Sequence, residues 1–163
     1  MKDTVKTNLF VDLDGCMADF DAGFPALFGI NHKEIPEAQM WATIEAHPSY
    51  FDALDPMPGA LDMFEALRAF RPTILTACPS TGFDKACAGK RSWCARHLGP
   101  DVPVITVRGG RNKPLHMKAA GDVLIDDWAK NIVAWNAAGG RGILFTSAKQ
   151  ALAEFQELAG RLT

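Results

Sequence analysis

The stretch Asn8-Leu9-Phe10-Val11-Asp12-Leu13-Asp14-Gly15 ends a short apolar run with two alternating carboxylates. Alternate side chains of a β-strand project from the same face, so Asp12 and Asp14 would lie together at the end of a buried strand. Mutual repulsion and loss of hydration disfavour such a pair unless a cation or a reaction requires it. The stretch therefore predicts a metal-dependent site.

Further apolar runs rich in β-branched residues follow along the chain, and helix-like stretches separate most of them. The expected strands are residues 9–13, 73–76, 102–107, 123–125 and 142–145. This β–α alternation is typical of a parallel sheet. The runs are almost continuously hydrophobic, which indicates helices on both faces. We therefore predict an α/β fold, a three-layer Rossmann-like sandwich around a parallel sheet of about five strands.

The helices that would connect these strands carry apolar residues at helical spacing. They are expected at residues 59–70, 83–98, 129–138 and 148–162. The pattern differs between residues 16 and 56, where aromatic residues and polar clusters occur without a convincing strand. We expect residues 16–56 to form a small helical cap inserted after the first strand, and residues 1–15 and 57–163 to form the catalytic core.

Size and composition suit one compact domain: the chain has 163 residues, of which 48% are hydrophobic and 22% are charged. A formal net charge of −2 gives no general attraction to a nucleic acid polymer or an anionic membrane. The polar N-terminus does not resemble a signal peptide, and no run approaches the ~20 apolar residues of a membrane span. We expect a cytoplasmic monomer or homodimer that acts on a small molecule.

The cysteines and histidines do not indicate a zinc site or a disulfide scaffold. Cys16, Cys78, Cys87 and Cys94 form no CxxC pair, and the four histidines show no HExxH spacing. We expect the cysteines to be reduced and mostly part of the core.

Polar side chains follow several of the expected strands, at the sheet edge where ligands bind in open parallel sheets. Thr76 ends the second strand, and Asp126 and Asp127 follow the fourth. Carboxylates from two strand ends can jointly hold Mg²⁺, which prefers oxygen ligands. Lys90 lies on the apolar stripe of the helix at 83–98, and an inward lysine needs an anionic partner.

In this order, these residues resemble the four motifs of the haloacid dehalogenase superfamily of phosphohydrolases. The motifs look like Phe10-Val11-Asp12-Leu13-Asp14-Gly15, then Leu75-Thr76, then Lys90, then Ile125-Asp126-Asp127. The resemblance implies the fold of that superfamily and an enzyme that hydrolyses phosphate monoesters.

The resemblance also implies a role for each catalytic residue. Asp12 would attack phosphorus and form an aspartyl phosphate, while Asp14 would act as general acid and then general base. Mg²⁺ would be held by Asp12, the backbone carbonyl of Asp14 and the Asp126/Asp127 pair. Thr76 and Lys90 would bind the phosphate oxygens.

Two basic residues besides Lys90 are candidates for binding the phosphate or the substrate. Lys113 is the alternative candidate for the motif-three lysine, but the helical position of Lys90 favours Lys90 for that role. Lys113 or Arg108 would then be available to bind the substrate.

Within the superfamily, the chain is most similar to the pyrimidine 5′(3′)-deoxyribonucleotidases. The similar segments are Asp12-Leu13-Asp14-Gly15-Cys16-Met17-Ala18-Asp19-Phe20, Pro56-Met57-Pro58-Gly59-Ala60 and Lys90-Arg91-Ser92-Trp93. This resemblance implies a deoxyribonucleoside monophosphate as substrate. Phe20, Trp41 and Phe51 are the aromatic candidates for a pocket around the base and sugar, because flat rings can stack on a base.

The sequence departs from the nucleotidase pattern at the substrate side. Ala77 stands at a candidate substrate-binding position where a serine is common, Trp128 follows the acidic pair where a basic residue is frequent, and the insert is shorter than in the vertebrate enzymes. Two alternatives therefore stay open: a phosphatase for another small ester such as a sugar phosphate, and a catalytically silent phosphate-binding module.

Overall fold

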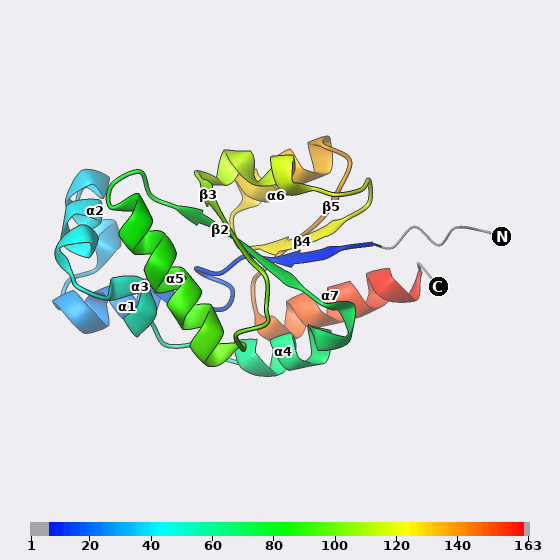
Figure 1. Ribbon diagram of the computed structural model, residues 1–163, viewed down its shortest axis with the longest axis horizontal. Helices are drawn as coiled ribbons and strands as arrows, with labels where there is room; N and C mark the ends of the chain where they lie inside the picture. Colours follow the sequence, from blue (N-terminus) through cyan, green and yellow to red (C-terminus); the bar gives the residue numbers. More distant parts are fainter. Residues whose placement is uncertain (1–6, 162–163) are drawn as a thin grey trace.

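The computed structural model describes residues 7–161, which form a parallel sheet with helices on both faces (Figure 1). The strand order is β3-β2-β1-β4-β5, and every neighbouring pair is parallel. The strands are β1 (Leu9–Val11), β2 (Thr73–Cys78), β3 (Val104–Arg108), β4 (Val123–Asp126) and β5 (Arg141–Leu144). The predicted α/β fold with five parallel strands is confirmed.

The helices that connect the strands also lie where the apolar spacing predicts them. They are α4 (Ala60–Leu67), continued by the 3-10 turn η2 (Arg68–Phe70), α5 (Phe83–His97), α6 (Ala129–Ala137) and α7 (Ala148–Gly160). A capping box between Ser147 and Gln150 fixes the start of α7, since each side chain satisfies a backbone N–H of the first turn.

The alternation of side chains along β1 divides the core into two layers. Leu9 and Val11 pack with α4, α5 and α7 on one face, whereas Phe10 points to the other face. There the Phe10 ring meets Trp135 of α6 edge to face, with 5.3 Å between ring centres. Both layers are visible in Figure 1, with α6 on one side of the sheet and α4 and α7 on the other. Burial on both faces explains why the strands read as continuous apolar runs.

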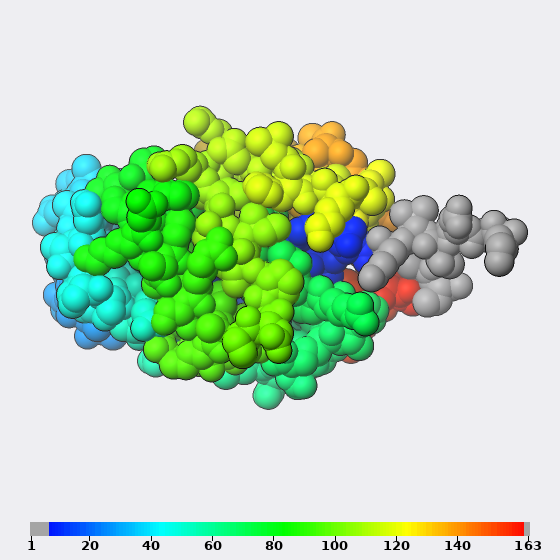
Figure 2. Space-filling view, in the orientation of Figure 1, coloured from blue at the N-terminus to red at the C-terminus, as the bar shows by residue number. Residues whose placement is uncertain are grey.

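Residues 16–56 form short helices and, within this described segment, no strand of the sheet. The elements are α1 (Phe20–Phe28), the 3-10 turn η1 (His32–Glu34), α2 (Glu37–Ala46) and α3 (Tyr50–Ala53). They lie beyond one end of the sheet, beside α5 (Figure 1), and the space-filling view shows them continuous with α5 on this face (Figure 2).

The last helix of this insert is joined to α5 by contacts of two α5 side chains. The indole Nε1 of Trp93 donates to the carbonyl of Leu54 at 2.7 Å, and the guanidinium of Arg96 pairs with the carboxylate of Asp52. The backbone of α3 also approaches Gly89 so closely that an added Cβ would lie 3.3 Å from Phe51. The insert is therefore anchored on α5.

Within residues 7–161, every helix falls short of the length and apolar character that a membrane span needs. All four cysteines are free thiols, and Cys16, Cys78 and Cys94 are buried.

Candidate active site

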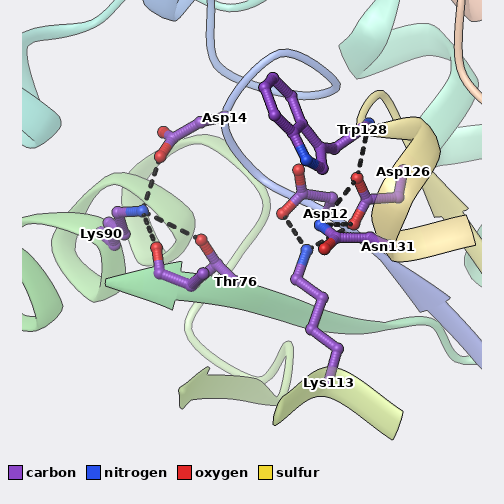
Figure 3. A network of polar contacts seen from close by, with 9 residues as sticks. Asp12, Asp14, Thr76, Lys90, Lys113, Asp126, Trp128 and Asn131 are labelled. Carbon is purple, nitrogen blue, oxygen red and sulfur yellow. Dashed lines mark hydrogen bonds and ion pairs between the residues drawn. The ribbon is translucent and has the colours of Figure 1, made fainter. Parts of the chain in front are cut away.

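Asp12 leaves β1 in a position fixed by the neighbouring strand. Its backbone N–H donates to the carbonyl of Ile125 at 2.9 Å, and its side chain is buried. One carboxylate oxygen accepts a hydrogen bond from the ammonium of Lys113 at 2.7 Å (Figure 3). Asp12 therefore lies at the carboxyl end of the sheet with a cation held against it.

Lys113 comes from the 3-10 segment η3 (Gly110–His116), and only 1% of its side chain is exposed. The same ammonium also donates to Asp126 at 2.6 Å. Burial by itself lowers the pKa of a lysine, but the charges of Asp12 and Asp126 outweigh it and hold the pKa of Lys113 above its usual value. Lys113 is therefore a permanent cation between two carboxylates.

Asp126 has partners on both of its carboxylate oxygens. One oxygen accepts the backbone N–H of Trp128 at 2.8 Å, and the other accepts Lys113 and, at 3.0 Å, the side-chain amide of Asn131. Burial, followed by the charge of Asp12, raises the pKa of Asp126. With its oxygens engaged, Asp126 serves to position Lys113.

Asp127 faces Asp12 and has the free carboxylate of the acidic pair. It lies against Gly15, whose φ of +80° is a left-handed conformation, and an added Cβ on Gly15 would come within 2.1 Å of an Asp127 oxygen. Burial and the neighbouring charge of Asp12 raise the pKa of Asp127. A side chain at position 15 would therefore leave no room for this carboxylate unless the Asp127 side chain moved.

The donor atoms around Asp12 and Asp127 match a hard cation. Ligand atoms of Asp12, Asp127 and Cys16 lie within 4.8 Å of one another. Burial raises the pKa of the Cys16 thiol, which keeps the sulfur neutral and leaves the carboxylates as the strong donors. The buried carboxylate of Asp12 and the exposed carboxylate of Asp127 repel each other, and a divalent cation between them would offset that repulsion.

Asp14 is paired with a different lysine from Asp12. Its Oδ2 accepts from Lys90 of α5 at 2.6 Å, and the Lys90 ammonium also donates to the Thr76 hydroxyl at 3.2 Å and the Ala77 carbonyl at 2.5 Å. The other oxygen of Asp14 is buried without a hydrogen-bond partner among residues 7–161. Burial raises the pKa of Asp14, although Lys90 opposes the shift. A carboxyl with a raised pKa and one free oxygen is suited to exchange a proton.

A cavity of about 620 Å³ opens beside these carboxylates. Asp14, Gly15 and Asp127 line one part of it, and Phe20 and Trp41 of the insert line another. The remaining lining residues are Asp21, His32, Ile35, Glu37, Met40, Met57 and Trp128. The cavity therefore joins the carboxylates of the core to an aromatic wall that the insert supplies.

The sequence of this chain matches one protein family over almost its whole length. Residues 6–158 match the family described as 5′ nucleotidase, deoxy (pyrimidine), cytosolic type C protein. The chain belongs to this family. Its members are phosphoric monoester hydrolases of the 5′-nucleotidase type, within the haloacid dehalogenase superfamily that the motifs resemble.

A curated relative agrees with this membership, and two solved structures share the fold. The cytosolic-type 5′(3′)-deoxyribonucleotidase of Homo sapiens is 29% identical over 143 residues, which cover 73% of this chain and 69% of that protein. A Bordetella bronchiseptica D,D-heptose 1,7-bisphosphate phosphatase, solved with magnesium and phosphate, has a TM-score of 0.54 at 12% identity, with 93% and 99% coverage. An Entamoeba histolytica HAD hydrolase has a TM-score of 0.51 at 13% identity, with 93% and 88% coverage. These two structures support the fold.

The structure of this nucleotidase-family chain brings all six predicted catalytic and metal-binding residues together. They are Asp12, Asp14, Thr76, Lys90, Asp126 and Asp127. Lys90 contacts Asp14 and Thr76, whereas Lys113 contacts Asp12 and Asp126. The assignment of the motif-three role to Lys90 rather than Lys113 stays a prediction. Lys113 is consequently engaged with carboxylates rather than left free for a substrate.

Of the predicted substrate-binding residues, Phe20 and Trp41 line the cavity, whereas Phe51, Ala77 and Arg108 do not. Phe51 is buried and its ring lies 4.6 Å from the Lys90 ammonium, because α3 packs on α5. The Ala77 carbonyl accepts from Lys90, and the Arg108 guanidinium stacks on Phe83 at 3.9 Å. The structure therefore places these three residues around the site rather than in the cavity.

The sequence analysis missed Asn131 and His32. Asn131 holds Asp126, and its position in the first turn of α6, directly after the acidic pair, was the available signal. His32 lines the cavity while its Nε2 contacts Asp21 at 2.8 Å, and no sequence pattern marks it.

Proposed function

We propose that this chain dephosphorylates deoxyribonucleoside monophosphates through an aspartyl-phosphate intermediate, with Mg²⁺ as cofactor. The observation that carries the proposal is a single cavity that joins the carboxylates of Asp14 and Asp127, next to Asp12, to Phe20 and Trp41. A nucleotide has a phosphate, which a cation held by the carboxylates would bind, and a flat base, which aromatic side chains can contact. Residues 16–56 would act as a cap that supplies this wall, and we expect the enzyme to act in the cytoplasm.

The first step would be attack by a carboxylate oxygen of Asp12 on phosphorus. A P–O bond to Asp12 forms as the ester P–O bond breaks, and the leaving alkoxide takes the proton of the Asp14 carboxyl. The raised pKa of Asp14 favours this protonated form at the start. Lys113 holds Asp12 in place and compensates its charge as the phosphate dianion approaches.

The second step would release inorganic phosphate. Asp14, now a carboxylate, takes a proton from a water molecule, and the water oxygen attacks phosphorus so that the bond to Asp12 breaks. Lys90 stabilises the carboxylate form of Asp14 during this step, since it donates to that residue at 2.6 Å. Asp14 and Lys90 thus act as a pair.

The residues that would hold Mg²⁺ are Asp12 and Asp127, through their carboxylates, with the backbone carbonyl of Asp14 as the third protein ligand that the family resemblance suggests. When bound, Mg²⁺ supplies positive charge that offsets the repulsion between the nucleophile and the phosphate dianion. Asp126 would support the site by positioning Lys113, because its oxygens are already engaged.

The substrate assignment combines the cavity with the name of the human relative, a 5′(3′)-deoxyribonucleotidase. Phe20 and Trp41 lie 6.3 Å apart between ring centres and offer faces or edges to a nucleobase. A sugar phosphate without a base would leave these rings unused.

The test measures phosphate release from 2′-deoxynucleoside 5′- and 3′-monophosphates and from sugar phosphates, with Mg²⁺ and with EDTA. We expect deoxynucleotides to be hydrolysed fastest, EDTA to abolish turnover, and Asp12→Asn to reduce it to background. Asp62→Asn, an exposed aspartate on α4, is the control for removal of a carboxylate. Full activity of Asp12→Asn or in EDTA would overturn the mechanism, and faster hydrolysis of sugar phosphates would overturn the substrate.

A further inference from the structure

Trp128 is an indole exposed at the mouth of the candidate active site. The residue is 58% exposed, although the buried carboxylate of Asp126 at the end of β4 lies only two positions before it. Its backbone is fixed, because its N–H donates to Asp126 at 2.8 Å (Figure 3). A large exposed apolar ring on a backbone held in this way can contact a ligand through its face.

The location of Trp128 separates it from ordinary exposed hydrophobic residues. It lines the same cavity of about 620 Å³ as Asp14 and Asp127. Phe20 and Trp41 reach this cavity from the insert, whereas Trp128 reaches it from the loop between β4 and α6. The cavity therefore has aromatic side chains from both parts of the chain.

The ring of Trp128 has no aromatic partner in the protein. Phe20 packs against the rings of His32, Trp41 and Tyr50. By contrast, within residues 7–161 no aromatic ring and no cation stacks on Trp128. The face of the indole is therefore available to a ligand in the cavity.

We infer that Trp128 is a specificity-determining residue that stacks on the nucleobase of the substrate. The charged groups at Asp12 and Asp127 fix the phosphate end of the cavity, and Trp128 follows Asp127 directly, so its ring contacts the alcohol part of the ester. Acidic residues Asp14, Asp21 and Glu37 share the lining and disfavour a second anionic group there. A nucleobase is flat, so it can stack on the indole, and it is uncharged, so the acidic lining does not repel it.

This inference rests on the proposed function, and its test compares two substrates that differ only in the base. The substrates are 2′-deoxyuridine 5′-monophosphate and 2-deoxyribose 5-phosphate, and the quantity is the ratio of their kcat/KM values. Base stacking on an aromatic side chain is worth ~1–3 kcal/mol, which corresponds to about 5- to 150-fold. We expect Trp128→Ala to lower the ratio by about that factor, through KM for the nucleotide, and Trp128→Phe to keep most of it.

Val133→Ala is the matched control, because Val133 is 68% exposed on α6 and does not line the cavity. An unchanged ratio in Trp128→Ala would overturn the inference, and so would an equal loss for both substrates, since that indicates a structural role beside Asp127. Failure of the proposed function gives a different result: the unsubstituted protein would then fail to hydrolyse the deoxynucleotide.

Discussion

Each of the two aspartates after β1 has its own buried lysine. Lys113 joins Asp12 to Asp126, and Lys90 joins Asp14 to the end of β2. Both lysine side chains are 1% exposed, so neither charge could be buried without its carboxylate. The pairing places one lysine against each aspartate and leaves one oxygen of Asp14 without a hydrogen-bond partner among residues 7–161.

The residue-scale prediction concerns the pair Lys113 and Asp126. Lys113→Met leaves Asp12 and Asp126 buried without their cation, and breaking a buried pair in this way typically costs about 3–5 kcal/mol of unfolding free energy. Asp126→Asn removes one of those charges. We therefore expect the double variant to be less destabilised than the sum of the single variants, by about 0.5–3 kcal/mol.

The measurement is a double-mutant cycle by urea denaturation, in EDTA so that no metal compensates the carboxylates. Lys118→Met combined with Asp126→Asn is the control cycle, because the Lys118 ammonium makes no ion pair within residues 7–161. Additive effects for Lys113 and Asp126 would contradict the prediction.

At the residue scale, the sequence predicted the burial of Lys90, whereas it marked Lys113 as a candidate without showing that it is buried or which groups it contacts. Lys90 interrupts an apolar helical stripe, so its burial and its need for an anion follow from periodicity. Lys113 lies in the 3-10 segment η3, after two glycines, where no period shows which side chains point inward. Its contact with Asp12 spans 101 positions in the chain and depends on the packing of η3 against the sheet.

At the element scale, the strand and helix positions were predictable, because strands that are buried on both faces of a sheet have continuously apolar sequences. Among the strand starts, that of β3 differs most: the expected strand begins at residue 102, but β3 begins at Val104. The N–H of Val102 bonds back to the carbonyl of Gly99, and Pro103 has no N–H to donate. The aromatic positions of the insert were less predictable, since its helices are short and only packing decides that Phe51 faces α5.

The tight turn after β1 gives the element-scale prediction. Gly15→Ala places a Cβ 2.1 Å from an Asp127 oxygen, so the carboxylate must move away from Asp12. Displaced support of a metal ligand typically lowers metal affinity about 10- to 100-fold, and we expect a loss of this size for Mg²⁺. The measurement is a Mg²⁺ titration followed by thermal unfolding.

Gly29→Ala is a close control for this substitution. Gly29 has a φ of +69°, near that of Gly15, but nothing lies within 4 Å of an added Cβ. Both variants carry the backbone strain of a left-handed alanine, and only Gly15→Ala disturbs Asp127. An equal change of Mg²⁺ affinity in both variants would show that the Asp127 contact is not the cause.

At the scale of the whole molecule, the site depends on both parts of the chain. The carboxylates and Trp128 come from the strand ends of the core, and Phe20 and Trp41 come from the insert. The division into a core and an insert stays a prediction from the sequence, where the apolar runs stop between residues 16 and 56. The sequence could not predict the shape of the cavity, which arises where the insert meets the core.

Acid stability of the whole fold depends on Asp122, which ties the start of β1 to the start of β4. It is fully buried and accepts four hydrogen bonds, from the backbone and side-chain amides of Asn8 and the backbone N–H groups of Lys118 and Ala119. Burial by itself would raise the pKa of Asp122, but these donors outweigh it and hold the pKa below its usual value. The stabilisation therefore belongs to the charged form.

For a carboxyl with a depressed folded-state pKa, the stability is present above the unfolded pKa of about 3.9 and is lost as the pH falls through the folded pKa. Asp122→Asn turns an amide toward backbone donors, which should cost about 1–3 kcal/mol of unfolding free energy at neutral pH. We expect this difference from the unsubstituted protein to be constant above about pH 5 and to shrink below about pH 4. Asp14, Asp126 and Asp127 titrate in the opposite sense but are present in both proteins, so their contribution cancels in the difference. Urea denaturation between pH 3 and 7 measures the difference in unfolding free energy between Asp122→Asn and the unsubstituted protein. Asp62→Asn, at an exposed position, is the control. A difference that stays constant down to pH 3 would exclude Asp122 as the source of acid sensitivity.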